Sequence, residues 1–255
     1  MINYIITIAL SLVMGLSVFL SWPIVSRKNI SLRRMLFYNA FAAGILVFLL
    51  MDIYGDVASI FNNSNITNPM ELLFIAAFAI SFLFLVYPRS SRDPEENPKR
   101  TSVLSAIGIG FQNLTEGLVF GSAGAAGMIP LYIVSVVGFS LQNITEGFPI
   151  AMPLVAMKQK VEKRFIAGAF LLGGIPAVIG TLIGLVFFSN TFIIFFDALA
   201  AAAILYVTLV LFHVNINKSR AKDRREMSSL MWLTYSGILA GFVVAFVINY
   251  IVVVQ

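Results

Sequence analysis

Long apolar stretches alternate with short polar connections along the whole chain. Each stretch is close to the roughly 20 residues that an α-helix needs to cross about 30 Å of hydrocarbon. No basic residue precedes the first stretch, so we expect a helix there rather than a cleaved signal peptide. The pattern predicts a single transmembrane domain over residues 1–255, an all-α integral membrane protein with helices at approximately 2–25, 31–52, 70–88, 102–122, 129–157, 163–188, 191–214 and 228–253.

The composition agrees with this pattern. Hydrophobic residues make up 59% of the chain and charged residues 11%, whereas soluble domains are usually about 25% charged. The mean hydropathy is +0.93. The chain contains no cysteine, which excludes disulfides and thiolate metal sites.

The 17 basic residues give a net charge of +5, but they are confined to alternate connections between the expected helices. They fall within residues 27–34, 89–100, 158–164 and 218–225. By the positive-inside rule these connections are cytoplasmic, and both termini are expected outside. We therefore expect the positive charge to orient the chain in a lipid bilayer, and we expect no nucleic-acid partner.

Two glutamates, Glu116 and Glu146, lie well inside expected helices. A charged side chain near the bilayer centre costs on the order of 2.5–3.5 kcal/mol, and no Lys or Arg lies inside a helix to pair with them. A bound proton or a bound cation must then offset the charge. Four further acids are expected near the outer ends of helices, where they either concentrate cations or simply reach water: Asp52, Asp56, Glu71 and Asp197.

The two glutamates belong to a repeated hexapeptide. Residues 112–117 read Gln-Asn-Leu-Thr-Glu-Gly and residues 142–147 read Gln-Asn-Ile-Thr-Glu-Gly, so five of the six positions are identical. In a helix the Gln and the Glu of each copy are four residues apart and share a face. If the two helices face each other, two carboxylates and four amides converge and can balance a divalent ion. The candidate metal residues are Gln112, Asn113, Glu116, Gln142, Asn143 and Glu146.

Two alternatives stay open for these segments. The polar side chains can join helices by hydrogen bonds without any ligand. Pro149 and Pro153 follow the second hexapeptide and deprive the helix of backbone hydrogen bonds. They either loosen the backbone beside the glutamates for transport or produce a purely structural kink.

The paired hexapeptides resemble the helix 4 and helix 5 motifs of the ZIP (Zrt/Irt-like) family of divalent-metal transporters. Weaker similarities are Phe-Ala-Ala-Gly at 41–44, Gly-Gly-Ile-Pro at 173–176 and Leu-Tyr-Val at 205–207. The resemblance implies an eight-helix ZIP-like bundle that works by an elevator-like or rocking motion and forms homodimers. It also implies a primary metal site at Gln112, Glu116, Gln142 and Glu146, and a second site at Asn113, Asn143 and Glu146.

The chain departs from the family pattern at several positions. Gln112 replaces the usual His, Ile175 replaces a carboxylate, and residues 209–212 read Leu-Val-Leu-Phe where an acidic motif is expected. The second site is therefore expected to be degraded. An amide oxygen in place of imidazole also makes the site harder and weakens its preference for zinc. His213, the single histidine, either accepts departing metal at the cytoplasmic end of its helix or is an ordinary interfacial residue.

The sequence thus predicts a multi-pass cell-membrane carrier that moves divalent cations of the zinc, iron and manganese class into the cytoplasm. No phosphate-binding loop indicates use of ATP, and no His-Glu-X-X-His segment indicates a protease, so we expect no enzyme and no cofactor besides the transported ion. Carboxylates bind metal when deprotonated, so uptake should weaken in acid. The alternatives are a scaffold or metal sensor that has lost transport, and a proton-coupled carrier of a small organic solute.

Overall fold

The computed structural model describes residues 4–25, 30–63, 69–87, 97–127, 129–155, 157, 161–220 and 222–253, and within these ranges every regular element is helical. The elements are α1 (Tyr4–Leu16), the 3₁₀-helix η1 (Ser17–Ser21), α2 (Trp22–Val25), α3 (Leu32–Asn63), α4 (Pro69–Val86), α5 (Pro98–Ala125), α6 (Ile129–Val155), α7 (Lys163–Gly184), α8 (Asn190–Arg220) and α9 (Arg224–Val253).

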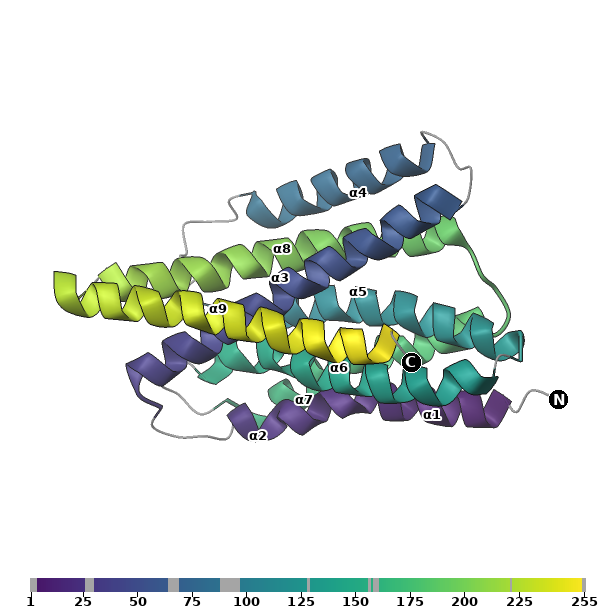
Figure 1. The fold of residues 1–255 in the computed structure, drawn as a ribbon, viewed down its shortest axis with the longest axis horizontal. Coiled ribbons are helices and arrows are strands. Elements are labelled where there is room, and N and C mark those ends of the chain that lie inside the picture. The colour runs from purple at the N-terminus through teal and green to yellow at the C-terminus, as the bar shows by residue number, and fades with distance from the viewer. Residues whose placement is uncertain are drawn as a thin grey trace.

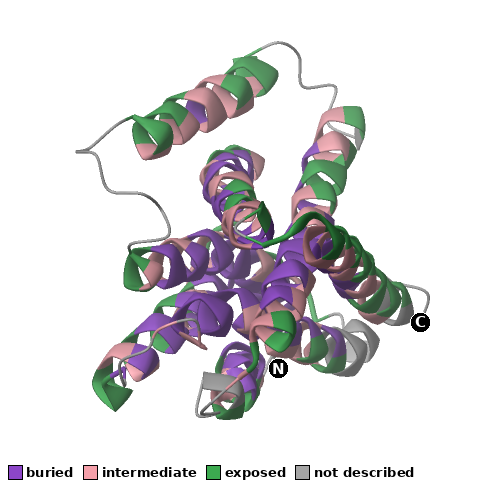
Figure 2. Cartoon of the chain, turned by 90° about the vertical axis from the view of Figure 1, so that its left-hand side faces the viewer, coloured by how far each residue is buried: buried purple, intermediate pink, exposed green. Residues whose placement is uncertain are grey.

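The helices form an elongated bundle in which most run close to the long axis (Figure 1). The most extensive contacts join α5 to α7 and α3 to α9, and α4 packs on α8 at the edge of the bundle. Buried residues gather where the central helices meet, whereas α4 stands apart and is mostly exposed or half-buried (Figure 2). The core therefore lies among the helices that carry and surround the two hexapeptides.

Seven helices in the described ranges are long and apolar enough to cross a membrane. They are Tyr4–Ser21, Leu32–Asn62, Pro69–Val86, Pro98–Ala125, Lys163–Gly184, Asn190–Arg220 and Arg224–Tyr250. The remaining long helix, α6, has 27 residues and is not among the seven. It carries the second polar hexapeptide. This architecture is compatible with a multi-pass membrane protein.

Two helices extend beyond the apolar stretches that predicted them. The stretch expected at 31–52 continues to Asn63 as α3, and the stretch expected at 191–214 continues to Arg220 as α8. A helix needs hydrogen bonds rather than apolar side chains to continue, so apolar length alone underestimates it. Asp52 and Asp56, expected near the outer end of this helix, lie inside α3, 11 and 7 residues before its last residue.

The first expected helix is interrupted. Between α1 and α2 the backbone tightens into η1, and the Trp22 N–H donates to the Phe19 carbonyl three residues back. Pro23 has no N–H to donate to that carbonyl, which explains why the regular α-helical bond is missing. This segment packs on the second hexapeptide: the Ser21 hydroxyl donates to the Ile144 carbonyl, and Gly147 lies against Val18 and Ser21.

Glycines bring α5 and α7 into close contact. A Cβ added at Gly117 would collide with the Ala177 carbonyl, and one at Gly180 would collide with the Leu114 carbonyl. Small residues at membrane helix interfaces allow this kind of approach. The close contact of Gly117 is therefore with α7 rather than with the other hexapeptide.

Candidate functional site

The two hexapeptides lie at the same level because α5 and α6 form an antiparallel hairpin. Asn97 caps α5, its side chain accepting a hydrogen bond from the Arg100 N–H at 3.0 Å, and Pro98 occupies the first turn. After α5, Gly127 adopts a φ of 73°, a conformation that glycine tolerates and other residues rarely adopt. Gln112 and Gln142 each lie 15 residues from Gly127 along the chain, so the antiparallel helices bring the starts of the two hexapeptides to the same level.

Gln142 connects the two carboxylates. Its Nε2 donates to Glu116 Oε1 at 2.7 Å and to Glu146 Oε1 at 3.0 Å. Gln112 Nε2 also donates to Glu116 Oε1, at 3.2 Å. The glutamates of α5 and α6 therefore share one amide donor.

The two asparagines form a second part of the same network. Asn113 Nδ2 donates to Asn143 Oδ1 at 2.7 Å, to the Gly173 carbonyl of α7 at 2.9 Å and to Glu146 Oε2 at 3.3 Å. Asn143 Nδ2 donates to the Met14 carbonyl at the end of α1, at 3.1 Å. The structure thus brings all six residues together and ties them to α1 and α7.

Most of this network is closed to solvent. Glu146 is 0% exposed, and the four amide side chains are buried, whereas Glu116 is partly exposed. Within the described part of the chain, two buried amide oxygens of the network, Gln112 Oε1 and Asn113 Oδ1, have no hydrogen-bond partner. Buried polar atoms are normally paired, so these two oxygens are available to a ligand.

In the described part of the chain, no Lys or Arg pairs with Glu116 or Glu146. The ion pair found there joins Lys222 to Glu226, at the start of α9. The described residues also contain no group of three or more His, Cys, Asp or Glu suited to a metal. The donor set here differs from such a group because it combines two carboxylates with amide oxygens. Oxygen ligands of this kind suit hard divalent cations such as Mg²⁺, Ca²⁺ and Mn²⁺.

One further acid joins the site from α8. Asp197 is buried, and its Oδ1 accepts a hydrogen bond from Thr115 Oγ1 at 2.8 Å. The interpretation of Asp197 as a side chain that reaches water at a helix end was therefore wrong. Thr115 lies within the first hexapeptide but was not among the candidate metal residues. In the sequence, the feature that could have indicated this contact is that Asp197 is an acidic residue within an otherwise apolar stretch.

The other acids expected near the outer face are more open. Asp52 is partly buried and accepts a hydrogen bond from Asn249 Nδ2 at 2.6 Å, which links α3 to α9. Asp56 and Glu71 are exposed. Asp56 and Glu71 are thus open to the surroundings of the protein, unlike Glu146 and Asp197.

The prolines of α6 do not end the helix, which continues through Pro149 and Pro153 to Val155. Serine hydroxyls from neighbouring helices donate to its carbonyls: Ser102 to Ile150 at 2.7 Å, and Ser21 to Ile144. These bonds attach α6 to its neighbours, whereas the carbonyls that the prolines leave without a helical donor are those of Thr145 and Pro149, four residues before each proline.

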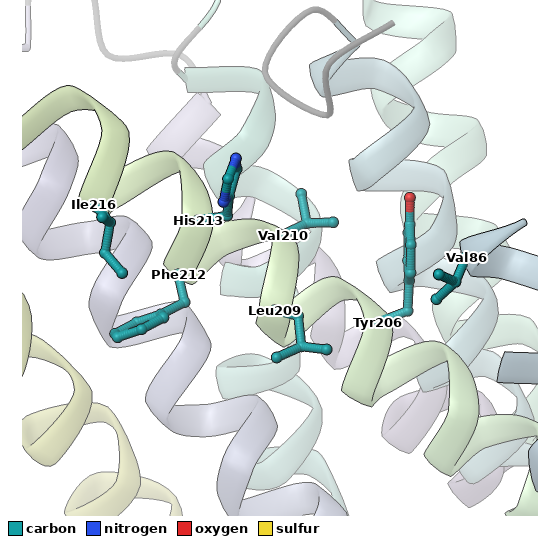
Figure 3. Close-up of a pocket in the computed structure, with 7 residues that line it drawn as sticks. All are labelled: Val86, Tyr206, Leu209, Val210, Phe212, His213 and Ile216. Atoms are coloured by element: carbon teal, nitrogen blue, oxygen red, sulfur yellow. The ribbon is translucent and has the colours of Figure 1, made fainter. Parts of the chain in front are cut away.

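His213 does not take part in the network. It is exposed, its Nε2 lies 2.9 Å from Asn217 Nδ2, and at 1.5 Å per residue it is roughly 24 Å along α8 from Asp197. It lines a cavity of about 430 Å³ between α4 and α8 (Figure 3). The other lining residues are mostly apolar: Val86, Tyr206, Leu209, Val210, Phe212 and Ile216.

No protein-family model matches the chain, and a search of curated proteins finds no match. The function is therefore inferred from the chemistry of the buried network.

Proposed function

We propose that the protein is a membrane transporter of divalent metal cations, which bind between α5 and α6. The observation that carries the proposal is the pair of carboxylates, Glu116 and Glu146, brought together inside a bundle of membrane-length helices without a basic partner. Two carboxylates at such depth need a compensating charge. A divalent cation between them supplies it.

The six residues of the two hexapeptides form the proposed site. Glu116 and Glu146 bind the ion directly, and the unpaired oxygens of Gln112 and Asn113 add neutral ligands. Gln142 and Asn143 complete the surroundings. Because the site lacks imidazole and thiolate, Mn²⁺ and Fe²⁺ are expected to compete well with Zn²⁺.

The proposed topology has eight crossings, with α6 as the additional one and both termini outside. At about 1.5 Å per residue α6 is long enough to span the hydrocarbon. The starts of α3 and α9 and the end of α8 lie at one end of the bundle (Figure 1), and Arg33, Lys218 and Arg224 lie there. That end is proposed to face the cytoplasm of a cell carrying the protein in its plasma membrane.

The resemblance of the hexapeptides to those of ZIP transporters supports the same proposal. It suggests inward transport, homodimers and a motion of the helices around the site, without ATP. Helices α1, α5, α6 and α7 surround the network, and they are the proposed moving unit.

Uptake into proteoliposomes tests this function. Purified protein is presented with Zn²⁺, Fe²⁺, Mn²⁺, Co²⁺ and Cd²⁺, beside the double variant Glu116→Gln, Glu146→Gln. We expect saturable uptake that the double variant loses. Glu162→Gln, at an exposed glutamate before α7, is the matched control and should retain uptake. Absence of uptake of every metal by well-folded protein would overturn the proposal and favour a scaffold or sensor.

A second candidate is a proton-coupled carrier of a small organic solute. It is favoured by Asp197, a third buried carboxylate beside the hexapeptides whose bound partner is the Thr115 hydroxyl. Acids inside membrane bundles often form proton relays. Proton-driven uptake of an organic solute, together with no metal uptake, would identify this function.

A further inference from the structure

The cavity between α4 and α8 lies on a face of α8 that changes from apolar to polar along the helix. Tyr206, Val210 and His213 line the cavity and follow one another at spacings of four and three residues, so they share one helix face. Tyr206 and His213 point to the same side of α8 (Figure 3). Asn217 and Arg220 continue the same spacing into the last turn. The cavity therefore leads directly to a polar helix end.

The cavity lies where α4 ends. Val86, the last residue of α4, lines it, whereas α8 continues as far as Arg220. Val86 and Leu209 are each 50% exposed, so the cavity is open to the surroundings of these two helices. For helices that cross a membrane those surroundings are hydrocarbon, which contains no water. Acyl chains, rather than water, are then the molecules that reach the cavity.

The length of the cavity matches one leaflet of a bilayer. At 1.5 Å per residue, Tyr206 and Ile216 are about 15 Å apart along α8, which is half of the roughly 30 Å of hydrocarbon. Arg220 lies about 6 Å further along the helix. The apolar lining thus has the length of an acyl chain region, and Arg220 lies at the level of the lipid head groups.

The polar end of this face offers donors to a phosphate. Asn217 Nδ2 lies 2.9 Å from His213 Nε2. Because an amide nitrogen can only donate, Nε2 accepts this bond, which leaves the proton of a neutral imidazole on Nδ1 as a free donor. Arg220 is exposed, and no acid within the described residues pairs with it. A guanidinium group binds phosphate oxygens through two parallel hydrogen bonds.

We propose that the cavity and the polar end of this face form a binding site for one anionic phospholipid. An acyl chain lies in the cavity beside Tyr206 and Val210, and the phosphate of the head group lies against His213 and Arg220. Such a lipid fits because its apolar part meets apolar side chains and its negative charge meets an unpaired cation. Anionic lipids are concentrated in the cytoplasmic leaflet, and the proposed topology places this end of α8 there. The leaflet, but not the binding site itself, rests on that topology.

Native mass spectrometry of the purified protein in detergent tests the site. Dioleoylphosphatidylglycerol is the anionic probe, and dioleoylphosphatidylcholine is the neutral one with the same acyl chains. We expect one phosphatidylglycerol per chain, bound about ten-fold more tightly than phosphatidylcholine, because hydrogen bonds to charged groups contribute about this factor. Arg220→Gln should remove the preference. Lys218→Gln is the matched control and should keep it, since Lys218 lies in the same turn but about 140° round the helix from His213.

A second pair of variants tests the apolar part of the site. Val86 is half exposed and lines the cavity, so Val86→Trp fills it without displacing the core. We expect this variant to bind both lipids more weakly. Leu83→Trp, about one turn earlier on α4, is the matched control, because Leu83 is exposed and does not line the cavity. It should bind both lipids as the unmodified protein does.

Three outcomes would overturn the inference. The first is equal affinity of the unmodified protein for the two lipids, and the second is a preference that Arg220→Gln and Lys218→Gln reduce alike. The third is a lipid-free dimer that Val86→Trp dissociates, which would assign this face to a second copy of the chain. None of these measurements involves a metal, so failure of the lipid site leaves the proposed transport function standing, and loss of metal uptake leaves the lipid site standing.

Discussion

Single atoms decide what the candidate site can bind. The side-chain amides of Gln and Asn each offer an oxygen and a nitrogen, and here the nitrogens face the carboxylates while Gln112 Oε1 and Asn113 Oδ1 remain unpaired. Inside a protein the low dielectric strengthens such contacts and makes an unpaired polar atom costly. Among the described residues the network therefore pairs both carboxylates with amide nitrogens and leaves two amide oxygens without a hydrogen bond.

Gly117 provides a prediction at the same scale. Gly117→Ala places a Cβ against the Ala177 carbonyl, and because this neighbour is backbone it cannot rotate away. We expect a loss of about 1–3 kcal/mol in the free energy of unfolding, from overpacking between α5 and α7. Thermal unfolding in detergent measures it.

Gly168→Ala is the control for this prediction. Gly168 lies on an exposed position of α7, with no atom within 4 Å of an added Cβ. Alanine is the better helix former, by up to about 1 kcal/mol, so this variant should be as stable as the unmodified protein or more stable. Equal stability of the two variants would contradict the close α5–α7 contact.

At the scale of elements, one hydrogen bond joins the hexapeptide hairpin to α8. Thr115 and Thr145 each donate to the carbonyl three residues back in their own helix, at 2.7 Å, but Thr115 Oγ1 also lies 2.8 Å from Asp197 Oδ1. The repeat is symmetric in sequence and asymmetric in its contacts. The bond from Thr115 links α5 to a helix outside the group that surrounds the network.

Replacing each threonine tests this difference. Thr115→Val leaves Asp197 buried without its donor, which should cost about 1–3 kcal/mol in the free energy of unfolding. Thr145→Val removes a bond within one helix and should cost much less, because such local bonds contribute little to helix stability. Thermal unfolding of the two variants side by side measures the difference, and equal losses would show that the Asp197 contact adds nothing.

For the whole molecule, the arrangement of charge at the two ends of the bundle predicts how the protein is oriented in the membrane. The chain has no cysteine, so single introduced cysteines report on accessibility without background. Ala126→Cys, at the exposed turn after α5, should react with a membrane-impermeant thiol reagent on intact cells. Ser228→Cys, exposed near the start of α9, should react after permeabilisation. The reverse pattern would overturn the proposed topology.

The sequence by itself determined that the chain is helical and suited to a membrane, because long apolar stretches are local features that do not depend on their neighbours. It also identified the six polar residues that meet in the network, since the repeat places the Gln and the Glu of each copy on one helix face. It did not reveal the length of α3, because polar residues continue a helix beyond the apolar stretch.

The tertiary structure alone decided which of these residues have partners. The contact of Asp197 with Thr115 and that of Asn143 with Met14 join residues far apart in the chain, so no local pattern encodes them. The same holds for the different partners of Gln112 and Gln142, which occupy the same position in the two copies of the hexapeptide. Neighbouring helices pack differently around α5 and α6, and this packing distinguishes the two copies of the hexapeptide.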